Sequence, residues 1–199
     1  MDTEEKIIEA AQTVFLKKGL DGARMQEIAD EAKINKALLH YYFRTKEKLF
    51  NAIFTKIASL AFPELSSVIL SDISFKEKID FTIDVYLNML NKHPYVPVFI
   101  LREINRDNSF LFKLVDIMGV NIQLILDHID RAMEQGEIVK MNPRHLIINV
   151  VSLCVFPYAA RPAIKHVLHK GVNYPVDTFM EERRDVLKKF IWDAIKVKN

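Results

Sequence analysis

Residues 25–49 read MQEIADEAKINKALLHYYFRTKEKL, and this stretch decides the fold of the first part of the chain. Apolar residues recur at helical spacing on each side of a short polar break, which predicts two short helices joined by a turn. Asn35 has a side chain that commonly caps a helix, and Thr45 can cap a third helix that begins with residues 46–48. Two short helices with a tight turn between them are typical of a helix-turn-helix.

The second short helix is predicted to have two different faces. Leu39 and Phe43 lie four residues apart, so they share a face and point toward the interior. Lys36, Ala37, His40 and Tyr41 are left on the outer face. An outer face with basic and aromatic side chains favours contact with DNA over a purely structural role.

The formal net charge of +2 is too small to indicate a nucleic-acid partner, but the distribution of charge is uneven. Residues 33–48 carry five basic side chains and one acidic side chain. Residues 1–32 carry four basic and eight acidic side chains. Positive charge is therefore concentrated in the segment that is predicted to touch DNA, although a charged run can also be a solvated surface.

The order of residues 32–49 resembles the DNA-binding signature of the TetR family of bacterial transcription regulators. That signature reads roughly A-G-V-S-x-G-x-L-Y-x-Y-F-x-S-K-E-x-L, and this chain keeps its alanine, leucine, Tyr-Phe, Lys-Glu and final leucine. Lys33 replaces the turn glycine, Ala37 replaces a frequent glycine and His40 replaces the first tyrosine. A single lysine can occupy a left-handed turn at a tolerable steric cost, and the His40 ring keeps a donor for a phosphate.

The resemblance implies which exposed residues contact bases and which contact phosphates. Lys36 and Tyr41 are expected to face base edges in the major groove, while Ala37 and Leu38 make apolar contacts such as those with thymine methyl groups. The remaining polar side chains are expected to bind phosphates and to set the register of the protein on the duplex. The predicted DNA-binding set is Arg24, Asn35, Lys36, Ala37, Leu38, His40, Tyr41, Tyr42 and Lys46.

Length and composition predict a helical protein with a substantial core. The chain has 199 residues, of which 50% are hydrophobic and 27% charged, and only five are glycine. Cys154 is the only cysteine, which excludes an intramolecular disulfide and a zinc cluster and favours a reducing, cytoplasmic compartment. The acidic start does not resemble a signal peptide, and no apolar run reaches the roughly 18 residues that span a bilayer.

The other helices are predicted from periodicity and from capping residues. Asp2 and Glu5 form a capping box for a first helix that Gly19 ends, and Ser74 and Glu77 form a second capping box. Asn142 caps a helix whose first residue is a proline. The predicted segments are a helix from 45 that ends before Pro63, a loop over 64–73, and helices over 75–91, 95–105, 110–135, 144–156, 163–169 and from 175 onward.

These elements predict an all-α fold with two domains. Residues 1–45 form the helix-turn-helix DNA-binding domain, and residues 46–199 form a larger helical domain for ligand binding and dimerisation. The helix over 144–156 is apolar nearly all round, which indicates that one side faces the core and another faces a second subunit. The resemblance implies that the last long helices of two subunits form a four-helix bundle. The predicted dimer residues are Ile147, Val151, Phe179, Leu187, Phe190 and Ile191.

The resemblance also implies a small-molecule cavity in the larger domain. Its candidate residues are Phe99, Arg102, Glu103, Phe110, Met118, Asn149, Cys154 and Tyr158. The aromatic residues can equally fill the core, and Arg102 with Glu103 can equally be a surface ion pair.

No constellation of residues supports catalysis or a metal site: His166 and His169 lie on one helix without a third ligand, and we predict no cofactor. The chain is therefore predicted to be a homodimeric DNA-binding regulator, most simply a repressor, that binds a palindromic operator in double-stranded DNA and is released by a small-molecule effector. The alternative is a helical small-molecule-binding or scaffold dimer whose head no longer binds DNA specifically.

Overall fold

The computed structural model describes residues 2–106, 109–110, 112, 115–116, 119–169 and 174–198, with the side chains of 58–63 and 169 excepted. Within these residues the regular elements are helices, apart from one isolated antiparallel bridge between Ile138 and Lys196. The all-α prediction is confirmed. The chain forms two compact units, of which the first comprises Met1–Leu60 with Lys92–Met118 and the second comprises Ala61–Asn91 with Gly119–Asn199.

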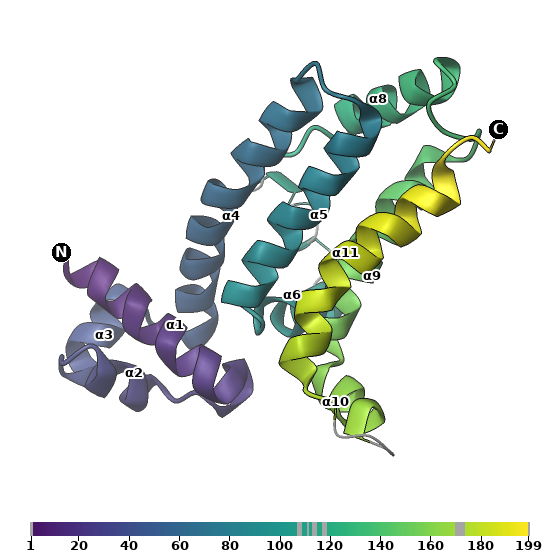
Figure 1. Cartoon of the computed structure of the whole chain (residues 1–199). Helices are drawn as coiled ribbons and strands as arrows, with labels where there is room; N and C mark the ends of the chain where they lie inside the picture. Colours follow the sequence, from purple (N-terminus) through teal and green to yellow (C-terminus); the bar gives the residue numbers. More distant parts are fainter. Residues whose placement is uncertain are drawn as a thin grey trace. The chain divides into compact units, whose positions relative to one another are not determined.

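The first unit contains the helix-turn-helix (Figure 1). Its helices are α1 (Thr3–Gly22), α2 (Met25–Glu31), α3 (Lys36–Tyr42), the beginning of α4 (Lys46–Leu70) and α6 (Val96–Arg106). The predicted capping box is confirmed, because Asp2 and Glu5 each bind the other's backbone N–H. Gly19 has a φ of 68°, so α1 is kinked there and continues for one more turn to Gly22. The predicted end of the first helix is thus a kink.

A cluster of aromatic rings holds α1, α4 and α6 together. The ring centroid of Phe15 on α1 lies 5.9 Å from that of Phe50 on α4 and 5.8 Å from that of Tyr95, just before α6. Phe50 and Phe99 stack with their centroids 3.5 Å apart. Such rings bury large apolar areas and have preferred mutual orientations, so they fix α6 within the same unit as the helix-turn-helix.

The second unit contains the rest of α4 together with α5 (Phe75–Lys92), α8 (Ile122–Glu134), α9 (Pro143–Ala159), α10 (Arg161–His169) and α11 (Val176–Ile195). Its two predicted caps are confirmed: Ser74 and Glu77 bind each other reciprocally, and the Asn142 side chain accepts from the Arg144 N–H at 3.0 Å. Helices α9 and α11 lie side by side (Figure 1). The core between the helices includes Ile83, Leu87, Val150, Cys154, Leu187 and Ile191.

Three predicted helix boundaries are wrong, those of α4, α8 and α9. Helix α4 continues through position 63 to Leu70, so the predicted loop over 64–73 is mostly helix. Helix α8 begins only at Ile122, where the Asn121 side chain accepts from the Leu124 N–H at 3.0 Å. Gly119 has a φ of 61° and nothing within 4 Å of an added Cβ, so it adopts a left-handed conformation three residues before α8 begins.

Helix α9 also passes its predicted end at position 156, continues through Pro157 and ends three residues later than predicted, at Ala159. A proline removes one backbone donor, and the buried side chains on either side of it can hold the helix together. Within the described parts of the chain, no single helix combines the length and apolar character needed to cross a membrane. Helices α9 and α10 reach that length and apolar character only when they are taken together, and the chain bends by 75° at the break between them.

Candidate nucleic-acid interface

The turn between α2 and α3 depends on Lys33. Its φ of 56° places it in the left-handed region, as predicted for the position where the family signature has glycine. The Lys33 N–H donates to the Asp30 carbonyl at 3.1 Å, and the Ile34 N–H donates to the Ala29 carbonyl at 3.0 Å. These two bonds form a Schellman motif, which satisfies the last carbonyls of α2 and turns the chain sharply into α3.

Helix α3 begins at the predicted residue, and its buried and exposed faces are those that the sequence predicts. The Asn35 side chain accepts from the Leu38 N–H at 2.7 Å and so caps the helix. Leu39 is fully buried and Phe43 is nearly so, which anchors the inner face. On the outer face Tyr41 is 82% exposed, and its ring meets that of Tyr42 edge-on at 5.5 Å. The structure therefore presents a rigid helix with its polar and aromatic side chains directed to solvent.

The other predicted base-contacting residues share that exposed face. Lys36, Ala37 and Leu38 are exposed in the first turn of α3. The basic residues on α3 and on the segments next to it in the sequence are also exposed, namely Arg24, Lys33, Lys36, Arg44 and Lys48. The cations that the sequence concentrates in this part of the chain are thus open to solvent, as binding to a polyanion requires.

His40 and Lys46, which are predicted to bind phosphates, have hydrogen-bond partners within the first unit. The His40 Nδ1 atom lies 3.2 Å from the Arg44 carbonyl oxygen, so that nitrogen carries a proton and donates it. Only an imidazolium would then have a second N–H for a phosphate. The Lys46 ammonium donates to the carbonyl oxygens of Asp21 at 3.3 Å and Ala23 at 3.1 Å, which directs it toward the end of α1.

The residues predicted for a ligand cavity fall into both compact units. Phe99, Arg102, Glu103 and Phe110 belong to the first unit, and Asn149, Cys154 and Tyr158 belong to the second. Phe99 stacks on Phe50 and is met edge-on by Phe110, so both rings are part of the aromatic cluster. Arg102 and Glu103 form an ion pair, with further partners in the first unit. Met118 lies outside the described residues.

In the second unit the three candidate ligand residues have different environments. Asn149 is exposed, whereas Cys154 and Tyr158 are buried. The Tyr158 hydroxyl donates to the Asn91 side chain at 2.6 Å. Burial raises the pKa of the Cys154 thiol and that of the Tyr158 phenol to about 12, so both groups are neutral near pH 7. They form part of a hydrophobic core.

The predicted dimer residues divide between the core and the surface. Leu187 and Ile191 are buried in the core of the subunit itself, so neither is available on its surface. Ile147, Val151 and Phe179 are half-buried, and Phe190 is 60% exposed. Helices α9 and α11 also expose large apolar residues that were not predicted, namely Ile148, Phe156 and Val186. Ile148 and Phe156 are eight residues apart on α9, and Val186 and Phe190 are four apart on α11, and this spacing was the available signal.

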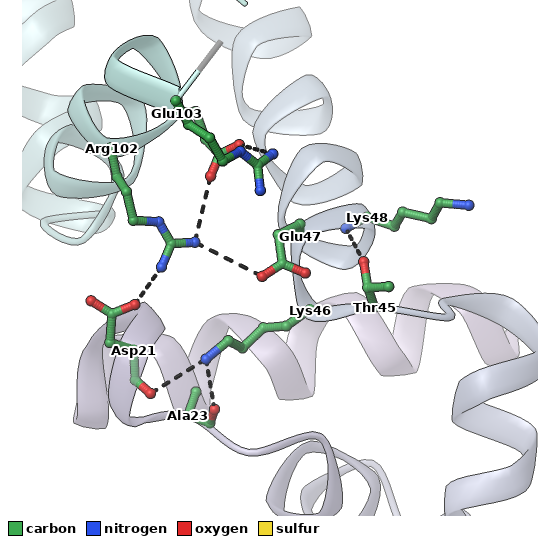
Figure 2. Close-up of polar contacts among 9 residues, drawn as sticks. Asp21, Ala23, Thr45, Lys46, Glu47, Lys48, Arg102 and Glu103 are labelled. Carbon is green, nitrogen blue, oxygen red and sulfur yellow. Dashed lines mark hydrogen bonds and ion pairs between the residues drawn. The ribbon is translucent and has the colours of Figure 1, made fainter.

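The acidic partners of Arg102 in other helices were not predicted from the sequence. Its guanidinium pairs with Asp21, at the end of α1, and lies 4.0 Å from Glu47, at the start of α4 (Figure 2). Asp21 and Arg102 are 81 positions apart in the sequence. No local pattern in the sequence indicates such a contact.

Comparisons with known proteins agree with this geometry. Residues 7–53, which run from α1 into α4, match the model of the bacterial regulatory proteins of the tetR family. The "Probable HTH-type transcriptional regulator YttP" of Bacillus subtilis is 25% identical over 179 residues, covering 88% of this chain and 86% of that protein. The negative transcriptional regulator IcaR of the biofilm operon icaADBC in Staphylococcus aureus is 31% identical over 87 residues, or 44% of this chain and 43% of IcaR.

A solved structure shares the fold over nearly the whole chain. The transcriptional regulator of the TetR/AcrR family from Thermobifida fusca has a TM-score of 0.67 at 16% identity, covering 94% of this chain and 97% of that one. The match of the family model includes the exposed helix α3 and the turn at Lys33 that positions it. The helix-turn-helix of this chain, within residues 7–53, therefore belongs to the TetR family of bacterial regulatory proteins.

Proposed function

We propose that this transcriptional regulator is a homodimeric repressor that places helix α3 of each subunit in the major groove of a palindromic operator. The observation that carries the proposal is the outer face of α3, where Tyr41 is 82% exposed while Leu39 on the opposite face is fully buried. A helix that is anchored on one side and presents a lysine and two tyrosines on the other suits contact with base edges.

The proposed division of roles follows the environment of each side chain. Lys36 and Tyr41 contact base edges, and Ala37 and Leu38 contact thymine methyl groups. Arg24 and Tyr42 contact phosphates, because each is exposed, Arg24 at the N-cap of α2 and Tyr42 as the last residue of α3. Lys46 stabilises the end of α1 through the carbonyls of Asp21 and Ala23, and this role takes the place of a phosphate contact.

The proposed dimer uses the apolar residues that α9 and α11 expose. Ile148, Phe156, Val186 and Phe190 are each at least 58% exposed in the single subunit. Large apolar side chains gathered on neighbouring helices indicate an interaction surface. Two-fold symmetry would then place the two α3 helices about 34–36 Å apart, which is one turn of DNA.

Repression is supported by IcaR, which is named a negative regulator. Release by a small-molecule effector rests on the family resemblance. An effector can shift the protein between two states only through a difference in its affinity for them. If a molecule is found that raises the melting temperature of the protein, operator affinity should fall as that molecule saturates it, and unchanged affinity would exclude it as an effector.

DNA binding is tested with duplexes from the region that flanks the gene of this protein, followed by a duplex selected by the protein from a random-sequence pool. Binding to the selected duplex should survive a large excess of non-specific competitor, and Tyr41→Ala and Lys36→Ala should reduce it selectively. Lys140→Ala is the matched control, because this exposed lysine lies in the second unit. If every competitor DNA displaces the protein from the selected duplex equally well, the result would support the alternative, a dimer with only a basic patch.

A further inference from the structure

The C-terminal end of α1 is held by two cations that come from different helices (Figure 2). Lys46, the first residue of α4, donates to the main-chain carbonyls of Asp21 and Ala23. Arg102, in the middle of α6, pairs with the carboxylate of Asp21. Free carbonyls at a helix end carry partial negative charge, so both cations are placed where they stabilise that end.

Arg102 joins three elements through one guanidinium. Its Nη1 atom pairs with Asp21 on α1, and its Nη2 atom lies 4.0 Å from Glu47 on α4 and 3.5 Å from Glu103 on α6. The guanidinium also lies 5.7 Å from the ring centroid of Phe99. A planar group with five donors can serve several carboxylates at fixed angles, which a lysine ammonium cannot do.

Glu103 explains why the arginine stays in place. Its side chain is only 2% exposed, and a buried carboxylate is strongly unfavourable without a paired cation. Arg106 also pairs with Glu103, from one turn further along α6. Among the residues that the structure describes, Arg106 forms no ion pair or hydrogen bond with α1 or α4. It therefore pairs with Glu103, as Arg102 does, but does not connect α6 to the other two helices.

The position of the end of α1 matters because it leads directly into the helix-turn-helix. Residues 23 and 24 connect α1 to α2, and Ala23 is itself one of the two residues whose carbonyls Lys46 binds. Lys18 on α1 adds a contact to Glu27 on α2 at 2.9 Å. Fixing the end of α1 therefore fixes the start of α2. The position of α3 then follows, because the hydrogen-bonded turn at Lys33 joins α3 to α2 at a fixed angle.

We infer that Arg102 is a positioning residue for DNA binding: from α6 it holds the end of α1 and the start of α4, and so sets the placement of α3 without touching DNA. This inference rests on the proposed function. It makes residues 92–106 part of the DNA-binding unit, in keeping with the first compact unit, which joins Met1–Leu60 to Lys92–Met118.

The test compares Arg102→Met with Arg106→Met in the full-length protein. Each change removes one guanidinium from α6 and one partner from Glu103, but only the first removes the contacts with Asp21 and Glu47. Affinity is measured for a duplex selected by the wild-type protein from a random pool, at several salt concentrations. Amide hydrogen exchange of residues 18–45 is followed in the protein without DNA.

Arg102→Met should weaken binding about three- to tenfold, as expected for losing two partly exposed ion pairs, and should speed exchange at the junction of α1 and α2. The slope of log affinity against log salt should stay at the wild-type value, because no phosphate contact is lost. Arg106→Met should change affinity by less than about twofold. Arg102→Lys, which keeps the charge without the planar fork, should recover only part of the affinity.

Asp21→Asn keeps the inference testable if Arg102→Met fails to fold, because its exposed carboxylate can be neutralised without disturbing Glu103. It should also speed exchange at the junction and weaken binding. Wild-type affinity and exchange in both Arg102→Met and Asp21→Asn would overturn the inference. A salt slope reduced by about one unit in Arg102→Met would also overturn it, because it would mean a phosphate contact.

These experiments distinguish a failure of this inference from a failure of the proposed function. Failure of the wild-type protein to select any duplex would contradict DNA binding itself, while the exchange measurement would still report whether Arg102 holds the end of α1.

Discussion

The Lys46 ammonium lies 3.1 Å from the carbonyl oxygen of Ala23, so the first residue of α4 closes the last turn of α1. Lys46→Met should lower the free energy of unfolding by about 1.5–3 kcal/mol, as expected for hydrogen bonds from a charged donor. It should leave the salt dependence of DNA binding unchanged. Urea denaturation and a salt titration of affinity check this, with Lys140→Met as the control, because this exposed lysine lies in the second unit. A salt slope lower by one unit with full stability would instead indicate a phosphate contact.

The cap of α3 gives a second prediction. Asn35→Ala should lower the free energy of unfolding by about 0.5–2 kcal/mol, because the Leu38 N–H loses its acceptor. Asn35→Ser should keep most of this stability, since serine is also a good N-cap. Urea denaturation measures both. If the two variants are equally stable, the side-chain cap contributes little to α3.

The left-handed turn gives a third prediction. Lys33 has a φ of 56°, and a side chain costs about 1–2 kcal/mol in that conformation. Lys33→Gly should therefore raise the free energy of unfolding by about 1 kcal/mol, while Lys33→Ala, which keeps the Cβ atom, should bring no such gain. Thermal and urea denaturation of the two variants separate the backbone effect from the loss of charge. Equal stability of the glycine and alanine variants would contradict it.

The exposed face of α11 gives a fourth prediction. Phe190→Glu should convert the dimer to a monomer at micromolar concentration, because a charge would be buried in an apolar interface. Light scattering after gel filtration measures the mass, and circular dichroism checks that the subunit stays folded. Lys140→Glu introduces the same side chain on the exposed surface of the second unit and should leave the dimer intact. A dimer that survives Phe190→Glu would place the interface elsewhere.

The fifth prediction concerns pH. Burial lowers the pKa of His93 below its ordinary value near 6.5, so the folded state favours the neutral ring. The unfolded state then binds more protons, and stability should fall as the pH drops below about 6.5 toward the lowered pKa. His93→Asn should make the free energy of unfolding less dependent on pH between 7.5 and 5.5. An unchanged dependence would assign the effect to other groups.

Local patterns in the sequence were enough to predict the helix-turn-helix. Asn35, Leu39 and Phe43 act through neighbours within four residues, so their cap and inward direction follow from spacing alone. The left-handed Lys33 followed from the resemblance, because the family signature has a turn glycine at its position. The same reasoning found the capping boxes at Asp2 and Ser74.

Boundaries and long-range partners could not be predicted in this way. Apolar periodicity continues through residues 110–121, although Asn121 caps a new helix, so spacing alone merged two segments. Leu187 and Phe190 both belong to the apolar pattern of α11, but only the packed structure shows that Leu187 is buried and Phe190 exposed. The contact from Asp21 to Arg102 depends on tertiary folding, so no sequence window contains it.

The buried Cys154 thiol has a practical consequence. It is the only cysteine of the chain, and its pKa is raised to about 12, so the reactive thiolate is nearly absent at neutral pH. A fluorophore attached to a newly introduced surface cysteine would therefore report from that one place, without a competing signal. Distances between two labelled subunits could then be followed directly, with the native cysteine left in place.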